Sequence, residues 1–323
     1  MITIKDIANA AGVSHATVSY VLNGRAKEQK ISAAVCERVL KLAKEMGYLR
    51  NEVAHSFGTG TSNIIGVILP EVASEYSGRL LYGISTEAAG HGYIPKLFYR
   101  LQPFEKTVEQ CVGQRVAGVI SYDLSSTAIH RELHKGLTKY GIPLCIAAGI
   151  SDQELGLRIS SDLEGGCRQA LQHVFRMGIR NTAILSEERG FYGWSQEMLN
   201  QFGKSARDCG MKAPVACTNV DELLAQPCQA VFCVSDFVAM HAIMKLRLAG
   251  RRIPEDIAVI GYGRLMLGEF AVPRITTIDE QLEELGKFAF RELLWKIRHP
   301  GEEERSFRFP MRLEIRESSM FKR

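Results

Sequence analysis

Four polar side chains that lie close together near the start of the chain could contact nucleic acid. His15, Thr17, Ser19 and Tyr20 supply one imidazole and three hydroxyl groups. Such groups donate hydrogen bonds to phosphate oxygens, and they both donate to and accept from base edges. Val18 lies among them on the apolar side of a predicted helix, so the four polar side chains face away from that helix's core. The pattern favours a short helix that offers its polar side to a partner.

Two short helices must position these groups. Thr3 is a predicted N-cap of the first, which Gly12 ends, and Ser14 is the predicted N-cap of the second, which ends at Asn23. Only Val13 separates the glycine from the serine, so the two helices must cross at a steep angle. That crossing is the helix-turn-helix geometry.

A third helix completes the expected core. Ser32 precedes it, and its apolar face consists of Val35, Val39, Leu42 and Met46. Residues 1–62 carry eight Lys or Arg against five Asp or Glu, a surplus of three in a chain whose net charge is +4. This modest basic bias suits phosphate contact, although a charged run is also typical of a solvated face.

The string IKDIANAAGVSHATVSYVLNG at residues 4–24 closely resembles the DNA-binding segment of the lactose-repressor (LacI/GalR) family. The resemblance implies that the second helix enters the major groove of DNA and that His15, Ala16 and Tyr20 contact bases. It also implies a set of phosphate contacts that fix position without selecting sequence, namely Thr3, Ser14, Thr17, Ser19 and Asn23.

The chemistry of the three expected base contacts differs. Ala16 offers only a methyl group, which suits a thymine methyl or mere clearance. His15 can donate to guanine N7 or O6, or can make no base contact. Tyr20 cannot make the bidentate guanine contact of an arginine, so we expect a different base preference there. The alternative for Tyr20 is packing along the backbone sugar.

A hinge is expected between residues 51 and 62. Asn51 can cap a short helix there, and the GTGTS stretch that follows is polar and suits a domain boundary. In the family this helix pairs with its dimer mate in the minor groove, where an apolar side chain opens the central base step. Phe57 aligns with that side chain and Ala54 with a small residue at the helix contact. The alternative is that Phe57 packs against the core domain.

The chain beyond residue 63 alternates apolar runs with amphipathic segments, which predicts parallel α/β architecture in two lobes. The apolar runs lie at 64–69, 93–99, 116–122, 143–149, 182–186, 230–235 and 257–262, and the amphipathic segments near 78–90, 129–140, 164–177, 195–209, 237–249 and 280–298.

The family resemblance extends through this region, in SDLEGGCRQALQHVFRMGIRNTAIL, SDFVAMHAIMKLRLAGRRIPEDIAVIGY and PRITTID. It implies a periplasmic-binding-protein-like core of two doubly wound lobes, which the chain crosses three times and which hold a small effector in the cleft between them. By the family layout, the N-lobe takes about 63–160 and 290–323, and the C-lobe takes about 161–289.

The expected effector positions depart from the family. An arginine that grips sugars or carboxylates is replaced by Met198, an aspartate by Ala148, and a Gly-[FY]-Asp-Asp turn becomes Gly-Tyr-Gly-Arg at 261–264. Unpaired buried polar groups cost about 1–3 kcal/mol each, so a sugar site needs such groups. Two explanations stay open: a different ligand, or a cleft that no longer binds one or that contacts a partner protein. For the first we expect an aromatic lining by Tyr76, Phe191, Trp194, Asp236 and Arg264.

Other classes of protein find little support in the sequence. The eight cysteines are scattered without a CxxC pair, which favours buried thiols over disulfides or zinc. His130 and His134 lack the glutamate spacing of a zinc protease, so we expect a solvated helix face. No catalytic motif or cofactor motif is present. No apolar run reaches membrane length and no signal peptide is visible, so we expect a cytoplasmic protein.

Together these observations predict a sequence-specific DNA-binding repressor. It would bind a pseudo-palindromic operator as a homodimer, under control of a sugar or another metabolite, and would not be an enzyme. A solute-binding protein of a transporter would share the core but lack the first fifty residues. An enzyme on an α/β scaffold would need a catalytic constellation that the sequence does not contain.

Overall fold

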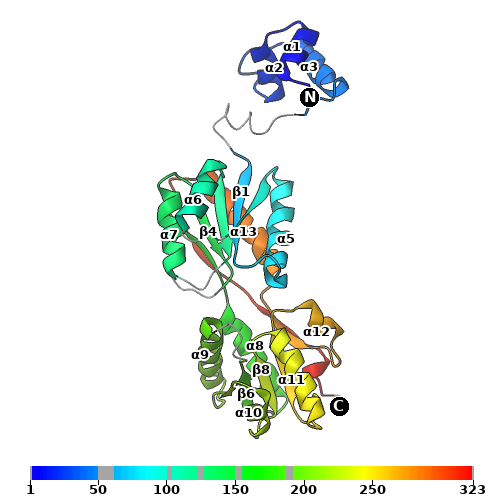
Figure 1. Ribbon diagram of the computed structural model, residues 1–323, viewed down its shortest axis with the longest axis vertical. Coiled ribbons are helices and arrows are strands. Elements are labelled where there is room, and N and C mark those ends of the chain that lie inside the picture. Colours follow the sequence, from blue (N-terminus) through cyan, green and yellow to red (C-terminus); the bar gives the residue numbers. More distant parts are fainter. Residues whose placement is uncertain are drawn as a thin grey trace. The chain divides into compact units, whose positions relative to one another are not determined.

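The computed structural model describes residues 2–49, 62–99, 104–122, 127–149, 155–186 and 192–321. The chain divides into two compact units, Met1–Thr61 and Ser62–Arg323 (Figure 1). The hinge residues Asn51, Ala54 and Phe57 lie outside the described residues, as do Phe191 and the side chain of Trp194.

The first unit is a bundle of three helices, and its caps form as the sequence predicts. Thr3 caps α1 and shares a capping box with Asp6. The side chains of Ser14 and Ser32 accept the N-terminal amides of α2 and α3. Gly12 ends α1 in the left-handed region, at φ 63°, where glycine has no steric penalty. The helices are α1 Ile4–Ala11, α2 His15–Leu22 and α3 Ala33–Glu45.

One apolar cluster holds the three helices together. Ile7, Val18 and Val39, one from each helix, have no exposed surface. Helices as short as α1 and α2 are marginal alone, so this shared core stabilises them.

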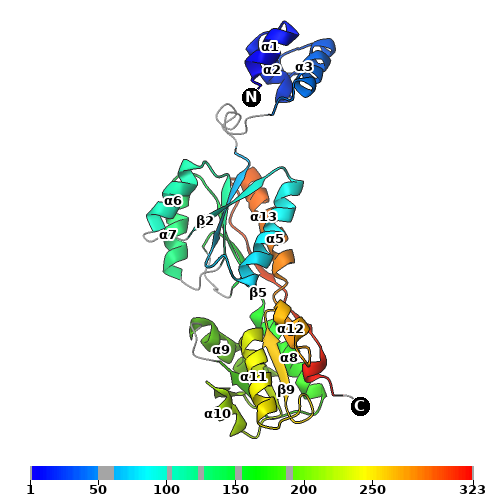
Figure 2. The same cartoon turned by 45° about the vertical axis from the view of Figure 1, so that its right-hand side comes forward.

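The second unit consists of two lobes, each a six-stranded sheet. The N-lobe sheet has the order β11-β5-β4-β3-β1-β2, and all its paired strands are parallel. Helices α5 and α13 cover one face and α6 and α7 the other (Figure 2). Its elements are β1 Ile64–Leu69, α5 Glu75–Gly90, β2 Ile94–Tyr99, α6 Phe104–Gly113, β3 Gly118–Tyr122, α7 Thr127–Thr138, β4 Leu144–Ala147, β5 Leu157–Ser161, α13 Leu282–Arg298 and β11 Ser306–Phe309.

The C-lobe sheet has the order β12-β10-β9-β8-β6-β7, and only the edge strand β12 is antiparallel to its neighbour. Helices α8 and α9 pack on one face, and α10 and α11 on the other. The predicted core of two doubly wound lobes is thus confirmed. The elements are α8 Leu163–Arg176, β6 Thr182–Leu185, α9 Tyr192–Asp208, β7 Val215–Cys217, α10 Val220–Leu224, β8 Ala230–Cys233, α11 Asp236–Leu248, β9 Ala258–Tyr262, α12 Met266–Phe270, β10 Thr276–Asp279, β12 Arg312–Glu314 and the 3-10 turn η1 Glu317–Ser319.

The predicted lobe boundaries after residue 280 are wrong. Helix α13 packs on the N-lobe from its first residue, Leu282, because its apolar face lies against α5 and the N-lobe sheet. Residues 312–319 belong to the C-lobe, because β12 pairs with β10 and the Ser318 hydroxyl donates to the Val259 carbonyl. The chain still crosses between the lobes three times, after β5, after β10 and after β11.

Two smaller expectations can be compared with the structure. The prediction of a solvated face for His130 is wrong, since this residue is only 2% exposed. His134 lies 3.3 Å from a Glu304 carboxylate oxygen. All eight cysteines are thiols outside any disulfide, and five are buried; burial raises the pKa of Cys111 to about 12. Among the described residues, no helix has the length and hydropathy needed to cross a membrane.

Candidate DNA interface and interlobe cleft

The exposed end of α2 carries the three expected base contacts. His15 and Ala16 are exposed in the first turn, and Tyr20 is half-buried one turn further on. Ala16 and Tyr20 are four residues apart, so they lie on the same side of the helix. The amides of the first turn and the positive end of the helix dipole suit an approaching phosphate.

Hydroxyl groups surround this end of the helix. Ser14 Oγ accepts the amide of Thr17 at 3.1 Å and lies 2.9 Å from Thr17 Oγ1. Further along, the Asn23 side-chain amide donates to Ser19 Oγ at 3.3 Å. Each hydroxyl has one donor and two acceptor sites, so these pairs keep capacity for a phosphate oxygen. The structure therefore brings Ser14, Thr17, Ser19 and Asn23 together on one helix and its cap.

Thr3 is less suited to a phosphate than the other four. Its hydroxyl donates to Asp6 Oδ2 at 2.7 Å and accepts the Asp6 amide at 3.3 Å. This side-chain hydrogen bond lowers the pKa of Asp6, which keeps a negative charge beside Thr3. Because the donor is already used, a phosphate contact there requires the capping box to rearrange.

Arg25 is a further candidate contact that the sequence did not predict. Its guanidinium carbon lies 5.8 Å from the centre of the Tyr20 ring, and its Nε lies 2.8 Å from Glu28. A cation over an aromatic face is attracted to it. Arg25 can therefore hold the Tyr20 ring and bring a positive charge to the edge of α2. The signal was its position just after the helix, at the Asn-Gly turn.

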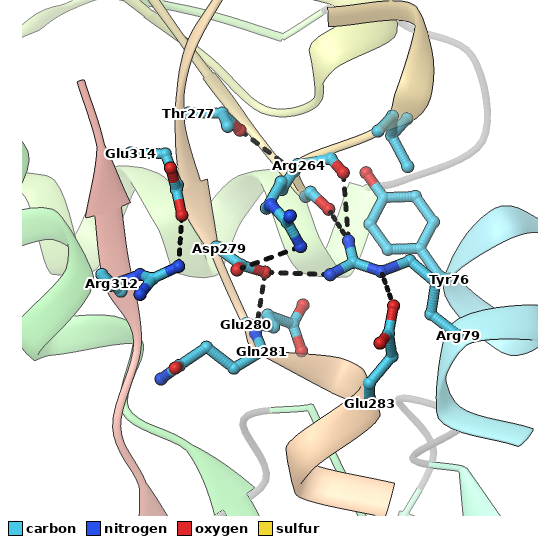
Figure 3. A network of polar contacts seen from close by, with 12 residues as sticks. Tyr76, Arg79, Arg264, Thr277, Asp279, Glu280, Gln281, Glu283, Arg312 and Glu314 are labelled. Carbon is cyan, nitrogen blue, oxygen red and sulfur yellow. Dashed lines mark hydrogen bonds and ion pairs between the residues drawn. The ribbon is translucent and has the colours of Figure 1, made fainter. Parts of the chain in front are cut away.

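The turn that follows β9 lies where the two lobes meet. Arg264, in the left-handed region at φ 50°, lies in this turn, and its NH1 is 3.8 Å from Asp279 Oδ2. Its side chain is 37% exposed, so the guanidinium stays accessible. Tyr76 of the N-lobe donates its hydroxyl to the Tyr262 carbonyl at 3.2 Å. The structure thus brings Tyr76 of the N-lobe into contact with the turn that carries Arg264 (Figure 3).

Asp236 lies behind this turn instead of at its surface. The residue has no exposed surface, and its Oδ2 accepts the Leu265 amide at 2.7 Å. A methyl group at Gly261 would lie 2.0 Å from Asp236 Oδ1, so the carboxylate fills the space that this glycine leaves. The prediction that Asp236 lines the effector site therefore needs correction: the aspartate holds the turn.

Substitution of Asp236 by asparagine should remove a pH dependence of stability. Burial raises the pKa of Asp236 from 3.8 to about 7, against the opposing hydrogen bonds of Thr277 and Leu265. The folded state then binds this proton more tightly than the unfolded state, so its contribution to stability falls as pH rises through that window. Urea unfolding at a series of pH values would test this. The difference in free energy of unfolding between wild type and Asp236→Asn should change between pH 3.8 and about 7, and a constant difference over this range would contradict the prediction.

Two of the positions that lost the family's polar groups, Met198 and Ala148, are buried in the cores of the lobes. Met198 has no exposed surface and belongs to the C-lobe core with Phe202 and Phe232. Ala148 is also fully buried, in the N-lobe. Among the described residues, a cavity of about 30 Å³ lies at the lobe crossover, which suits about one water. Its lining is Ser160, Ser161, Leu163, Glu164, Glu197, Gln201 and Arg308.

Comparison with known proteins agrees with both units. Residues 3–51 match the model of bacterial regulatory proteins of the lacI family, and residues 171–319 match the periplasmic binding protein-like domain. The chain is 29% identical over 342 residues to the HTH-type transcriptional repressor PurR of Vibrio atlanticus, covering 100% of this chain and 99% of that protein. It is 27% identical to the ribose operon repressor of Halalkalibacterium halodurans, covering 99% and 97%.

Solved structures show the same architecture. The lac repressor dimer bound to operator and the anti-inducer ONPF superposes with a TM-score of 0.86 at 22% identity, over 99% of each chain. The transcriptional regulator CelR in complex with cellobiose has a TM-score of 0.67 at 25% identity, over 98% of this chain and 100% of that one.

The helix-turn-helix unit and the two-lobed core define a DNA-binding transcription regulator, not an enzyme. The chain carries a lacI-family DNA-binding domain, followed by a periplasmic binding protein-like core.

Proposed function

We propose that this regulator is a repressor that acts in the cytoplasm on a pseudo-palindromic operator, bound as a homodimer. The observation that carries the proposal is helix α2, which is capped by Ser14 and leaves His15 and Ala16 exposed in its first turn. A helix of this kind, held by a small bundle, fits the major groove. Two copies related by two-fold symmetry require an operator with matching symmetry.

The contacts divide into two kinds. His15, Ala16 and Tyr20 contact base edges and select sequence. Ser14, Thr17, Ser19 and Asn23 contact phosphates and fix the position of α2 on the duplex. Thr3 is retained as a weaker phosphate contact because of its bond to Asp6.

The minor-groove hinge remains part of the proposal. Asn51, Ala54 and Phe57 lie outside the described residues, so their support is the sequence pattern alone. We assign Phe57 to the central base step, where an apolar side chain can open the stack and bend the duplex.

The C-lobe presents a surface suited to a second copy. Phe237, Met244 and Leu248 are exposed along α11, at 64%, 51% and 79%. Phe270 and Val272, at the end of α12 and just after it, are 78% and 73% exposed. The Arg247 guanidinium donates to the Val272 carbonyl at 2.8 Å, so the two groups adjoin. Contiguous exposed apolar side chains of this kind mark an interface.

Substitution of Phe270 by aspartate should give monomers. A charge at the centre of an apolar interface is buried without a partner, which disfavours association. Sedimentation velocity of the full chain should show a dimer for wild type and a monomer for Phe270→Asp. Tyr140→Asp, at another exposed aromatic residue, is the control and should remain a dimer. A dimer in the Phe270 variant would refute the assignment.

For the effector we propose a sugar or another metabolite in the interlobe cleft. Arg264 and Tyr76 are its described candidate contacts, with Phe191 and Trp194 as candidates from the sequence alone. The relative named as a ribose operon repressor and the cellobiose complex of CelR support a small polar ligand as a class.

Selection of bound sequences from a random DNA pool tests the proposed function. The full chain should enrich a pseudo-palindrome, and its affinity should fall as salt rises, with a log–log slope of about −0.9 for each phosphate contacted. Phe57→Ala should weaken binding to the selected site. Failure to enrich any sequence, or binding that ignores salt, would refute a sequence-specific regulator.

A further inference from the structure

The start of helix α5 in the N-lobe is joined to the C-lobe by side chains of this chain itself (Figure 3). Arg79 donates through NH1 to the carbonyls of Gly263 and Arg264, both at 3.0 Å. Its NH2 donates to Asp279 Oδ1 at 3.3 Å, and its Nε lies 3.5 Å from Glu283. The Arg79 side chain is 12% exposed. One arginine therefore binds the C-lobe turn, the crossover and α13 together.

Two neighbours on α5 extend the contact. The Glu75 carboxylate accepts the Met266 amide, at 2.9 and 3.1 Å to its two oxygens. Tyr76 donates to the Tyr262 carbonyl at 3.2 Å. These hydrogen bonds and those of Arg79 all join the N-lobe to the C-lobe. We therefore call Glu75, Tyr76 and Arg79 the interlobe clamp.

The turn is shaped to receive this clamp. Gly263 has φ 107°, a conformation that side chains rarely adopt, and a methyl group there would lie 2.3 Å from the Tyr76 hydroxyl oxygen. Only glycine leaves room for the tyrosine. Gly263 and Arg264 are the positions where the family carries acids, and acidic side chains there would compete for Arg79 with the carbonyls. The two residues that depart from the family pattern are thus the two whose carbonyls bind Arg79.

The crossover provides a second tie. Glu280 is buried and accepts the Ser161 hydroxyl of β5 at 2.9 Å, and it also accepts the Tyr262 hydroxyl of β9. Asp279 accepts the Gln281 amide at 2.8 Å in addition to its contact with Arg79. The clamp therefore continues into a buried network that joins both sheets.

We propose that the interlobe clamp is a built-in lock that holds the two lobes together without a small molecule, and that the locked form is the one that binds the operator. The locked state needs no ligand because Arg79 supplies the bridging hydrogen bonds that an effector would otherwise make. An effector then acts by displacing Arg79 or Tyr76 from the turn. This rests on the proposed function, since it assigns the ligand-free state of the regulator.

The clamp affects DNA binding through the fraction of molecules that are in the operator-binding form. The N-lobe leads directly into the linker of the DNA-binding unit, so the lobe angle sets how the linkers of a dimer approach. If the lobes are free to change angle, the operator-binding form is only a fraction of the molecules, and the apparent Kd rises by the inverse of that fraction. Loss of the clamp therefore weakens operator binding without altering any DNA contact.

Hydrogen exchange of the ligand-free full chain measures the lock directly. The Met266 amide is bonded across the lobes to Glu75, whereas the neighbouring Leu265 amide is bonded within the C-lobe to Asp236. Arg79→Met should speed exchange at Met266 at least tenfold and leave Leu265 unchanged. Arg291→Met is the control, because Arg291 pairs with Glu87 inside the N-lobe.

A glycine pair gives an independent variant. The added methyl group of Gly263→Ala collides with Tyr76. Gly250→Ala is its control, because Gly250 also has a positive φ, 79°, but a methyl group there has no atom within 4 Å. Only Gly263→Ala should speed hydrogen exchange at the Met266 amide. The double variant Gly263→Ala/Tyr76→Ala should recover part of the yield of folded protein, but its Met266 amide should still exchange fast.

Operator affinity completes the test. Arg79→Met and Gly263→Ala should bind the selected operator at least tenfold more weakly than wild type, and the two controls should match wild type. Unchanged protection of Met266, or unchanged or tighter operator binding in Arg79→Met, would overturn the lock. If wild type itself fails to bind a selected operator, the proposed function fails, while the exchange result still decides whether the clamp exists.

Discussion

Gly83→Ala should destabilise the core by about 3 kcal/mol, because it overpacks a close backbone contact between two helices of the N-lobe. A methyl group at Gly83 of α5 would lie 2.0 Å from the Glu283 carbonyl oxygen of α13. On the facing helix, a methyl group at Gly286 would lie 2.4 Å from the Leu80 carbonyl oxygen. Both partners are backbone atoms, so no side chain can move aside, and the two helices must separate.

Gly78→Ala, on the same helix, should have the opposite effect. A methyl group there meets nothing within 4 Å, so alanine should stabilise the helix by about 0.5–1 kcal/mol. Urea unfolding at one protein concentration would measure both, since a dimer's stability depends on concentration. Equal stability of the two variants would show that α5 and α13 are not in this contact.

The second large effect is expected at α2. His15→Ala and Tyr20→Ala should each remove a base contact of about 1–3 kcal/mol, and a homodimer loses it twice. We therefore expect at least a 30-fold loss in affinity for the selected operator, from two losses of about 1 kcal/mol each. Binding to unrelated DNA should change little, because phosphate contacts dominate it.

The salt dependence separates base contacts from phosphate contacts. His15→Ala should leave the slope of log affinity against log salt unchanged and relax the base preference at one position of each half-site. Glu37→Ala, on the exposed side of α3, is the control for general effects of substitution. If Tyr20→Ala weakens all sequences equally, Tyr20 packs along the sugar instead of contacting a base.

Local signals made the first unit predictable. The caps Thr3, Ser14 and Ser32 act within a few residues, and so does the turn glycine Gly12, so their effects can be inferred without knowledge of the tertiary fold. The strands at 64–69 and 257–262 were equally clear, because strands buried on both faces are continuous apolar runs. By contrast, β5 escaped notice because a buried arginine, Arg158, interrupts it.

The errors lie where distant segments meet. Nothing near Leu313 indicates that its strand pairs with β10 instead of joining the N-lobe. The burial of Asp236 depends on Gly261 and Leu265, far along the chain. The clamp could not be inferred either, since Arg79 is distant in sequence from Gly263, and its neighbours on α5 give no sign of a partner.

The threefold crossing has a consequence for biosynthesis. Neither lobe is a continuous stretch of chain: the N-lobe sheet lacks β11 until Phe309 has been made, and the C-lobe sheet lacks β12 until Glu314. The three-helix unit, in contrast, is complete by Glu45. Domains fold as units and in order of synthesis, so on the ribosome the DNA-binding end can fold long before either half of its controlling core. Until then each sheet lacks one edge strand and leaves the neighbouring strand, β5 or β10, without its partner. The late emergence of residues 306–314 is therefore the step at which chaperone dependence should end.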